Sequence, residues 1–174
     1  MKHLVWVVGA VALGLAVGCN KTVPLNDAER AAIADSVSQV ATQWMADLSK
    51  QPTVERYAAA FAPGADILHA EKGTLITTRD SILEVARAAF KSSASFSAVM
   101  KERRILVPDR DVAVLGAQVD LAVKDSAGKE WSGREAWTAV FHRTSDGWKI
   151  VADHESFPPE PAPATPVKRS RRTE

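Results

Sequence analysis

The hydrophobic pattern of this chain changes its period near Ser95, and no other feature constrains the fold as much. Before Ser95, apolar residues recur at the spacing of amphipathic helices. After Ser95, apolar and polar residues alternate, which indicates strands with one buried face. We expect four such strands, over residues 96–107, 112–124, 130–143 and 148–157. Their connections are short and rich in turn residues, so the strands should form an antiparallel meander.

The segment before this change predicts helices and a small hairpin. A capping-box pattern at Asn26 indicates a helix over residues 26–48. A second, short helix follows Thr53 and carries Tyr57 and Phe61. We further expect a hairpin from strands 66–70 and 74–77, and a third helix over 79–90. Helices followed by a run of strands predict an α+β fold, with three N-terminal helices packed on a curled antiparallel sheet.

The amino terminus predicts export and lipidation. The apolar run over residues 4–17 follows Lys2 and is shorter than the about 20 residues that span a bilayer, which is typical of a secretory signal peptide. The sequence Leu15-Ala16-Val17-Gly18-Cys19 resembles a bacterial lipobox. This resemblance implies a signal peptide over 1–18, lipidation of Cys19 by diacylglycerol and an acyl chain such as palmitate, and a tether over 19–25. We expect anchoring in the cell envelope, and Asn20 after the cysteine favours the outer membrane.

Composition argues against several kinds of partner. The chain has 22 basic and 21 acidic residues, so it lacks the basic excess of a nucleic-acid-binding protein. The histidines show no metal-ligand spacing and Cys19 is assigned to lipid, so we expect no metal and no cofactor. Residues 158–174 combine prolines with a basic cluster and are expected to be a disordered tail.

Two segments carry a resemblance to a known family. They are Tyr57-Ala58-Ala59-Ala60-Phe61-Ala62-Pro63-Gly64-Ala65-Asp66 and Asp146-Gly147-Trp148-Lys149-Ile150-Val151-Ala152-Asp153-His154-Glu155-Ser156. With the order of elements, they make residues 26–157 similar to the SnoaL-like branch of the nuclear transport factor 2-like superfamily. The resemblance implies a cone-shaped fold whose sheet wraps the first helix and leaves a pocket at its open end. It does not select a function, because the superfamily contains isomerases, cyclases, dehydratases and assembly modules.

Alternation along the closing strand predicts which side chains face this pocket. The mostly apolar set is expected to point inward: Trp148, Ile150, Ala152, His154 and Ser156. Lys149, Val151, Asp153 and Glu155 would then point outward. An inward His154 would be a candidate general base or ligand-binding group. The alternative is a structural histidine that is hydrogen-bonded at the end of the sheet.

The preceding strand supplies further candidates for the pocket. Trp131, Glu135 and Trp137 share one face of it, and an inward Glu135 would need a cationic partner. The tryptophans could wall a ligand or could simply fill the core. Trp44, Tyr57, Phe61 and Trp148 complete the expected apolar lining.

His69 is a third candidate for catalysis. The resemblance to steroid isomerases places their catalytic carboxylate at Ala70, between His69 and Glu71, and their first-helix tyrosine near Trp44. Their acid–base groups are therefore missing, although His69 or Glu71 could act as a substitute base.

Three hypotheses for function follow from the sequence. The first is a membrane-anchored domain that binds a small apolar or amphipathic molecule without turning it over. The second is an enzyme of the isomerase, cyclase or dehydratase type, with His154 or His69 as general base. The third is a dimerisation or protein-docking module, in which a sheet face forms a homodimer.

Overall fold

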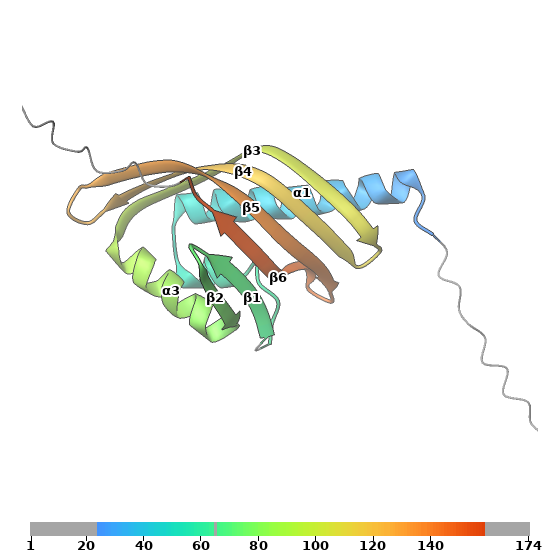
Figure 1. The fold of residues 1–174 in the computed structure, drawn as a ribbon, viewed down its shortest axis with the longest axis horizontal. Coiled ribbons are helices and arrows are strands. Elements are labelled where there is room, and N and C mark those ends of the chain that lie inside the picture. The colour runs from blue at the N-terminus through green and yellow to red at the C-terminus, as the bar shows by residue number, and fades with distance from the viewer. Residues whose placement is uncertain (1–23, 65, 159–174) are drawn as a thin grey trace, which may run out of the picture.

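The computed structural model describes residues 24–64 and 66–158 (Figure 1). The expected signal peptide, the lipidation site at Cys19 and the tail beyond residue 158 lie outside these residues. Helices and strands follow in the order α1 (Asp27–Lys50), α2 (Val54–Ala58), β1 (Asp66–Glu71), β2 (Thr74–Thr78), α3 (Arg79–Ser92), β3 (Ser93–Asp109), β4 (Val112–Asp125), β5 (Glu130–Thr144) and β6 (Gly147–Ser156). The change from helical to alternating period thus coincides with the junction of α3 and β3.

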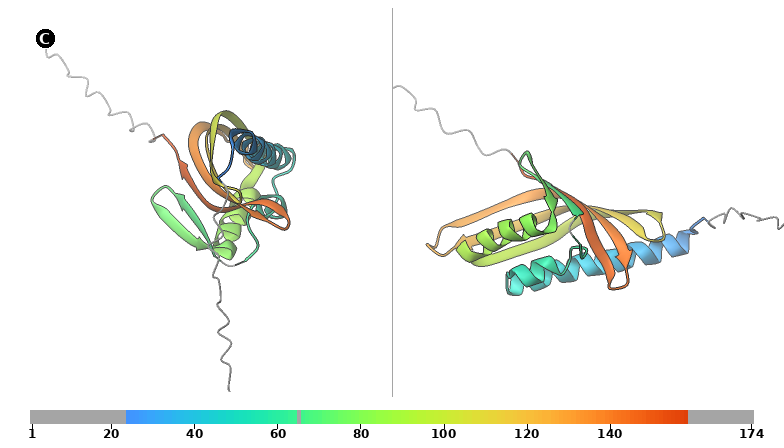
Figure 2. Two further views of the ribbon diagram at one scale, coloured as in Figure 1. Left: turned by 90° about the vertical axis from the view of Figure 1, so that its right-hand side faces the viewer. Right: turned by 90° about the horizontal axis from the view of Figure 1, so that it is seen from below.

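The strands form a single curled sheet with the order β2-β1-β6-β5-β4-β3. The long strands β3 to β6 are antiparallel neighbours, as predicted. The expectation of a wholly antiparallel sheet is wrong at one place, because β1 pairs with β6 in parallel. A parallel pair needs a long connection, and α3 with the three strands that follow it provides one. Figure 2 shows α1 and α3 on the same side of the sheet, within its curl.

The first helix forms as its capping pattern predicts. The Asn26 side chain accepts a hydrogen bond from the backbone N–H of Glu29 at 2.9 Å, and the Glu29 carboxylate accepts one from the N–H of Asn26 at the same distance. The buried stripe of α1 packs against β3 and β4 and comprises Val37, Ala41, Met45 and Leu48. Among the described residues, no helix is both long and apolar enough to cross a membrane.

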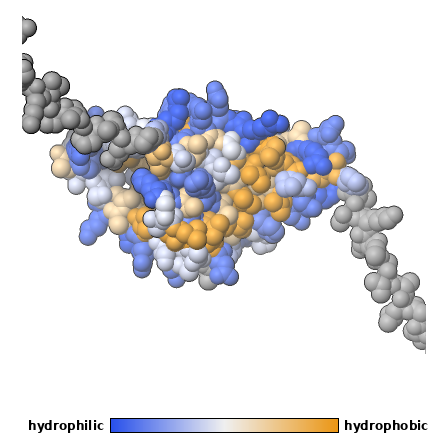
Figure 3. Space-filling model, viewed as in Figure 1, coloured by the Kyte–Doolittle hydropathy of each residue, from blue (hydrophilic) through white to orange (hydrophobic). Residues whose placement is uncertain are grey.

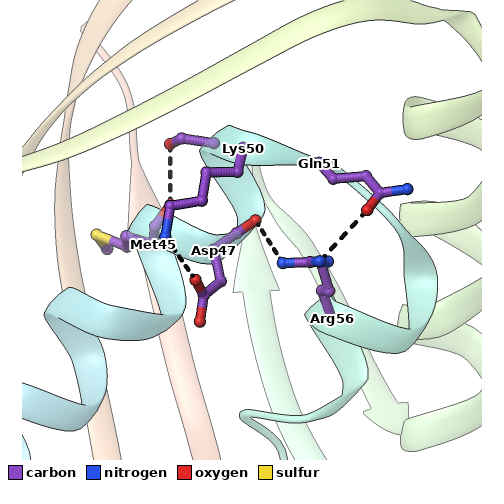
Figure 4. Close-up of polar contacts among 6 residues, drawn as sticks. Met45, Asp47, Lys50, Gln51 and Arg56 are labelled. Carbon is purple, nitrogen blue, oxygen red and sulfur yellow. Dashed lines mark hydrogen bonds and ion pairs between the residues drawn. The ribbon is translucent and has the colours of Figure 1, made fainter.

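The corner between α1 and α2 is fixed by polar contacts (Figure 4). The Arg56 guanidinium donates hydrogen bonds to the Asp47 carbonyl at 3.2 Å and to Gln51 Oε1 at 3.3 Å. The indole N–H of Trp44 donates to the Arg56 carbonyl at 3.0 Å. These bonds hold α2 against the end of α1 and thereby position Tyr57, which follows Arg56 directly.

A β-bulge in β6 decides which of its side chains face the helices. Phe141 on β5 pairs with Ile150, but the preceding Val140 pairs with Ala152, so Val151 is an extra residue in β6. Side chains alternate again after the bulge, with the opposite residues facing inward. Asp153 is therefore buried, whereas His154 is exposed.

The outer face of the sheet carries a band of apolar side chains. Cross-strand neighbours form it on five adjacent strands, from β3 through β4, β5 and β6 to β1: Leu106, Val114, Val140, Ala152 and Leu68. Leu106 and Leu68 are exposed and the other three are half-buried. Figure 3 shows hydrophobic residues gathered across this face of the molecule.

Candidate ligand cavity

A cavity of about 240 Å³ lies between the helices and the inner face of the sheet. Its wall is mostly apolar and aromatic, and every element except β2 contributes to it. The apolar lining residues are Trp44, Met45, Leu48, Tyr57, Ile82, Val85, Ala86, Ala89, Phe90, Phe96, Ala98, Leu121 and Trp137. The polar lining residues are His69, Glu71, Glu135 and Glu155, from the strands β1, β5 and β6.

The register of the sheet brings these polar residues together. His69 on β1 is the neighbour of Asp153 on β6, and Glu71 is the neighbour of Glu155. Glu155 in turn pairs with Trp137 on β5, and Glu135 lies two residues before Trp137 on the same face. Adjacent strands therefore place one imidazole and four carboxyl groups at one end of an otherwise apolar cavity.

His69 and Asp153 form a buried pair. His69 Nδ1 lies 2.9 Å from Asp153 Oδ1, and the indole N–H of Trp137 donates to Asp153 Oδ2 at 3.3 Å. His69 Nε2 lies 3.7 Å from Glu71 Oε2. Burial lowers the pKa of His69, but the hydrogen bond and charge of Asp153, with the charges of Glu155 and Glu71, outweigh it, so the pKa lies above its ordinary value. The carboxylate orients the ring and favours its protonated form.

Two glutamates in the cavity are held toward the neutral form. Burial, followed by the charges of Glu71 and Asp153, raises the pKa of Glu135 to about 7. Burial and the charges of Glu135 and Asp153 raise the pKa of Glu155 to about 8. Glu135 is only 5% exposed, and its Oε2 has no hydrogen-bond partner among the described residues. The cavity therefore takes up protons near neutral pH.

Aromatic rings surround the rest of the cavity. The ring of Trp44 lies 5.7 Å from that of Tyr57 and 5.8 Å from that of Trp137, and the ring of Phe90 lies 6.0 Å from Tyr57. Burial, together with the nearby carboxylates, raises the pKa of Tyr57 well above its ordinary value, so its hydroxyl stays neutral. The wall offers flat apolar area and a phenol, next to the acidic end.

The structure sorts the pocket residues expected from the sequence into three groups. Trp44, Tyr57, Glu135 and Trp137 line the cavity, and so does His69. Phe61 and Trp148 are buried in the core and do not line it.

The third group lies outside the cavity. Trp131 is 47% exposed near the end of the sheet, where its ring packs against Phe157. The expectation that His154 and Ser156 point inward is wrong, because the bulge at Val151 turns both to the outer face. The proposed inward role of His154 loses its geometric basis.

Sequence reasoning assigned Asp153 and Glu155 to the outer face, yet Asp153 pairs with the cavity histidine and Glu155 lines the cavity. One signal was present: Ile150, Val151 and Ala152 are consecutive apolar residues that break the alternation of β6. Such a break is compatible with a bulge, and a bulge exchanges the two faces of everything that follows it.

Three of the clustered groups are close enough to share a metal ion. One ligand atom from each of His69, Asp153 and Glu155 lies within 4.8 Å of the others. The His69–Asp153 hydrogen bond and the Trp137 indole already engage both oxygens of Asp153 and one nitrogen of His69. We therefore assign no metal to the cluster.

The curled sheet and its helices enclose an apolar cavity with polar residues at one end. This architecture defines a class of small domains that carry a ligand pocket. The chain belongs to the SnoaL-like domain family, whose model matches residues 37–160. A search of curated proteins found no match.

Solved structures share the fold at low sequence identity. A nuclear transport factor 2-like superfamily protein from Salmonella enterica serovar Typhimurium is 14% identical, covering 80% of this chain and 98% of its own, with a TM-score of 0.66. A protein assigned as a scytalone dehydratase from Novosphingobium aromaticivorans is 13% identical over 78% of this chain and 93% of its own (TM-score 0.65). A type 2 hexachlorocyclohexane dehydrochlorinase is 12% identical over 76% and 89% (TM-score 0.62). These likenesses concern the fold alone.

Proposed function

We propose that this domain binds one small, largely apolar molecule in its cavity while lipid on Cys19 tethers the chain to a cell-envelope membrane. The observation that carries the proposal is the hollow itself, which has aromatic walls and a few polar groups gathered at one end. This combination is typical of small-molecule sites, where apolar area supplies affinity and a few polar groups orient the ligand.

The size of the cavity limits the ligand. An apolar cavity of about 150 Å³ in another protein holds a benzene molecule. At about 240 Å³, this cavity takes a somewhat larger molecule, such as one ring with a short polar substituent. The neutral compound 2-phenylethanol is therefore a suitable probe.

Filling the cavity should abolish binding of this probe. Ala89 on α3 is exposed yet lines the cavity, so Ala89→Trp places an indole in the ligand's volume without overpacking the core. Ala88→Trp is the matched control, because Ala88 is exposed on the same helix and does not line the cavity. By isothermal titration calorimetry of the full chain in lipid nanodiscs, we expect Ala89→Trp to weaken binding about tenfold or more. Equal affinities for the two variants would contradict the proposed site.

The His69–Asp153 pair favours a second candidate function, proton transfer on the bound molecule. A histidine whose Nδ1 is held by a buried carboxylate is oriented for general acid–base catalysis through Nε2, and His69 lines the cavity. The reaction class would be an isomerisation or elimination. Incorporation of deuterium from D₂O into small cyclic ketones, followed by NMR, tests it: exchange should occur with the unmodified chain and stop with His69→Gln. If no exchange occurs, proton transfer is refuted and ligand binding remains the proposed function.

A further inference from the structure

We propose that the ligand is a cation, namely a small aromatic or alicyclic ring that carries an ammonium group, with this group bound among Glu71, Glu135 and Glu155. The inference rests on the proposed function and names the chemical class that the cavity accepts. It follows from the balance of charges around the cavity, from the state of Glu135 and from the aromatic wall.

The balance of charges is acidic. Three carboxyl side chains and one imidazole line the cavity, and no lysine or arginine is among the lining residues. The imidazole of His69 has ion-pair contacts with Asp153 and Glu71, and with neither Glu135 nor Glu155. Lys72 binds Glu71 from the solvent side at 2.8 Å, with most of its side chain exposed. Glu135 and Glu155 are thus left without a cation of their own inside the cavity.

Glu135 shows that the cavity lacks a donor at this point. Its side chain is 95% buried, it faces the cavity, and its Oε2 accepts no hydrogen bond from any described residue. A buried carboxyl oxygen without a partner costs free energy that a donor would recover. An ammonium group brings three N–H donors and a positive charge, whereas a hydroxyl brings one donor and no charge. The unpartnered oxygen therefore fits an amine better than an alcohol or an acid.

The other elements around the cavity add no competing charge. The α1 and α3 helices and the strands β3 and β4 contribute only apolar lining residues, and α2 contributes the neutral Tyr57. The rings of Trp44, Tyr57 and Trp137 can hold the ligand ring and attract its cation through their faces. A bare metal ion would leave this apolar volume unfilled.

Binding of an ammonium ion should displace protons. The raised pKa values of Glu135 and Glu155 mean that the site carries shared protons near neutral pH. A bound cation favours the ionised carboxylates, so these protons leave. The charges of His69, Glu71, Asp153 and Lys72 also act on Glu135. Affinity for an amine should therefore rise with pH between 6 and 8.5.

The test compares three probes of similar shape on the full chain in lipid nanodiscs, with empty nanodiscs as the blank. At pH 8.5, we expect 2-phenylethylamine to bind about tenfold more tightly than 2-phenylethanol, and phenylacetate to bind most weakly. The advantage of the amine should shrink at pH 6. Titrations at pH 7.5 in Tris and in phosphate should differ in heat, because protons are released.

Two variants test whether Glu135 gives the amine its advantage over the alcohol. Glu135→Gln should remove most of the advantage of the amine over the alcohol, while Glu130→Gln, an exposed position on the same strand, should leave it unchanged. If Glu135→Gln does not fold, the pH dependence of the amine affinity of the unmodified chain tests the inference instead.

Three results would overturn the inference. Equal binding of alcohol and amine would refute the cationic ligand and leave the proposed function intact. No binding of any probe would refute both. A stoichiometric divalent metal in the purified chain, measured by mass spectrometry, would show that the carboxylates serve a metal instead.

Discussion

Glu135 illustrates how far a single residue can be interpreted from the sequence. Alternation along its strand predicted that it points inward, and its burial confirms this. The same reasoning required a cationic partner for it, but the structure places Trp137 and other carboxyl groups nearby, and its Oε2 is left unpartnered. Sequence spacing reveals the direction of a side chain within its strand, whereas its neighbours depend on the register of strands far apart in the chain.

At the residue scale, Glu135→Gln should stabilise the protein at high pH. A carboxyl whose pKa is raised in the folded state ionises more readily in the unfolded chain, so stability falls as pH rises from about 4.5 to about 7. The neutral amide of the variant does not ionise, so its stability does not fall over this pH range. We expect the free energy of unfolding of the variant to exceed that of the unmodified chain by about 1–3 kcal/mol at pH 8, with no difference below pH 4.5.

Denaturant unfolding at the two pH values measures this difference. Glu130→Gln, whose carboxylate is exposed on the same strand, should match the unmodified chain at both. Destabilisation by Glu135→Gln at pH 8 would mean that the ionised carboxylate has a favourable role in the fold.

At the scale of elements, the four long strands and the capped first helix were predictable because each has a local cause in periodicity or capping. Two features were not. The parallel pairing of β1 with β6 joins strands that are distant in sequence. The bulge at Val151 inserts one residue and exchanges inner for outer positions along the rest of β6. This exchange turns His154 outward, brings Glu155 to the cavity and places Asp153 against His69, which makes the polar end of the cavity more acidic than the sequence suggested.

The apolar band on the outer face of the sheet is suited to the alternative function, a homodimer, which we retain as a proposal. The band through Leu106, Val140 and Leu68 is a contiguous apolar surface, and such surfaces commonly mark interfaces. Two copies related by a twofold axis would cover it. Light scattering of the full chain in detergent should then report a dimer, and Val140→Glu, which places a charge in the band, should yield monomers.

Thr138→Glu provides the control, because Thr138 is exposed on the same strand one pleat away and is not part of the apolar band. A monomeric unmodified chain at micromolar concentration would contradict the proposed dimer and leave the cavity unaffected.

At the scale of the whole molecule, the cavity and the proposed tether lie toward different ends of α1. Trp44, the first cavity residue of this helix, lies about 25 Å along it from Asp27, at the usual helical rise per residue. The proposed attachment point, Cys19, precedes Asp27 by a few residues. We therefore propose that the anchor joins the chain on the side of α1 that is remote from the cavity, so ligand binding should not depend on it.

Two measurements examine this separation. The mature chain should begin at Cys19 and exceed its polypeptide mass by a diacylglyceryl group and an acyl chain, and an unmodified Cys19 would refute the anchor. The affinity for 2-phenylethylamine should then agree within about twofold between the lipidated chain in nanodiscs and a chain that starts at Asn20, because the proposed attachment point precedes the end of α1 that is remote from the cavity. A larger loss in the shorter chain would show that the bilayer surface, or the tether itself, completes the binding site. The cavity would then be one part of a membrane-dependent site.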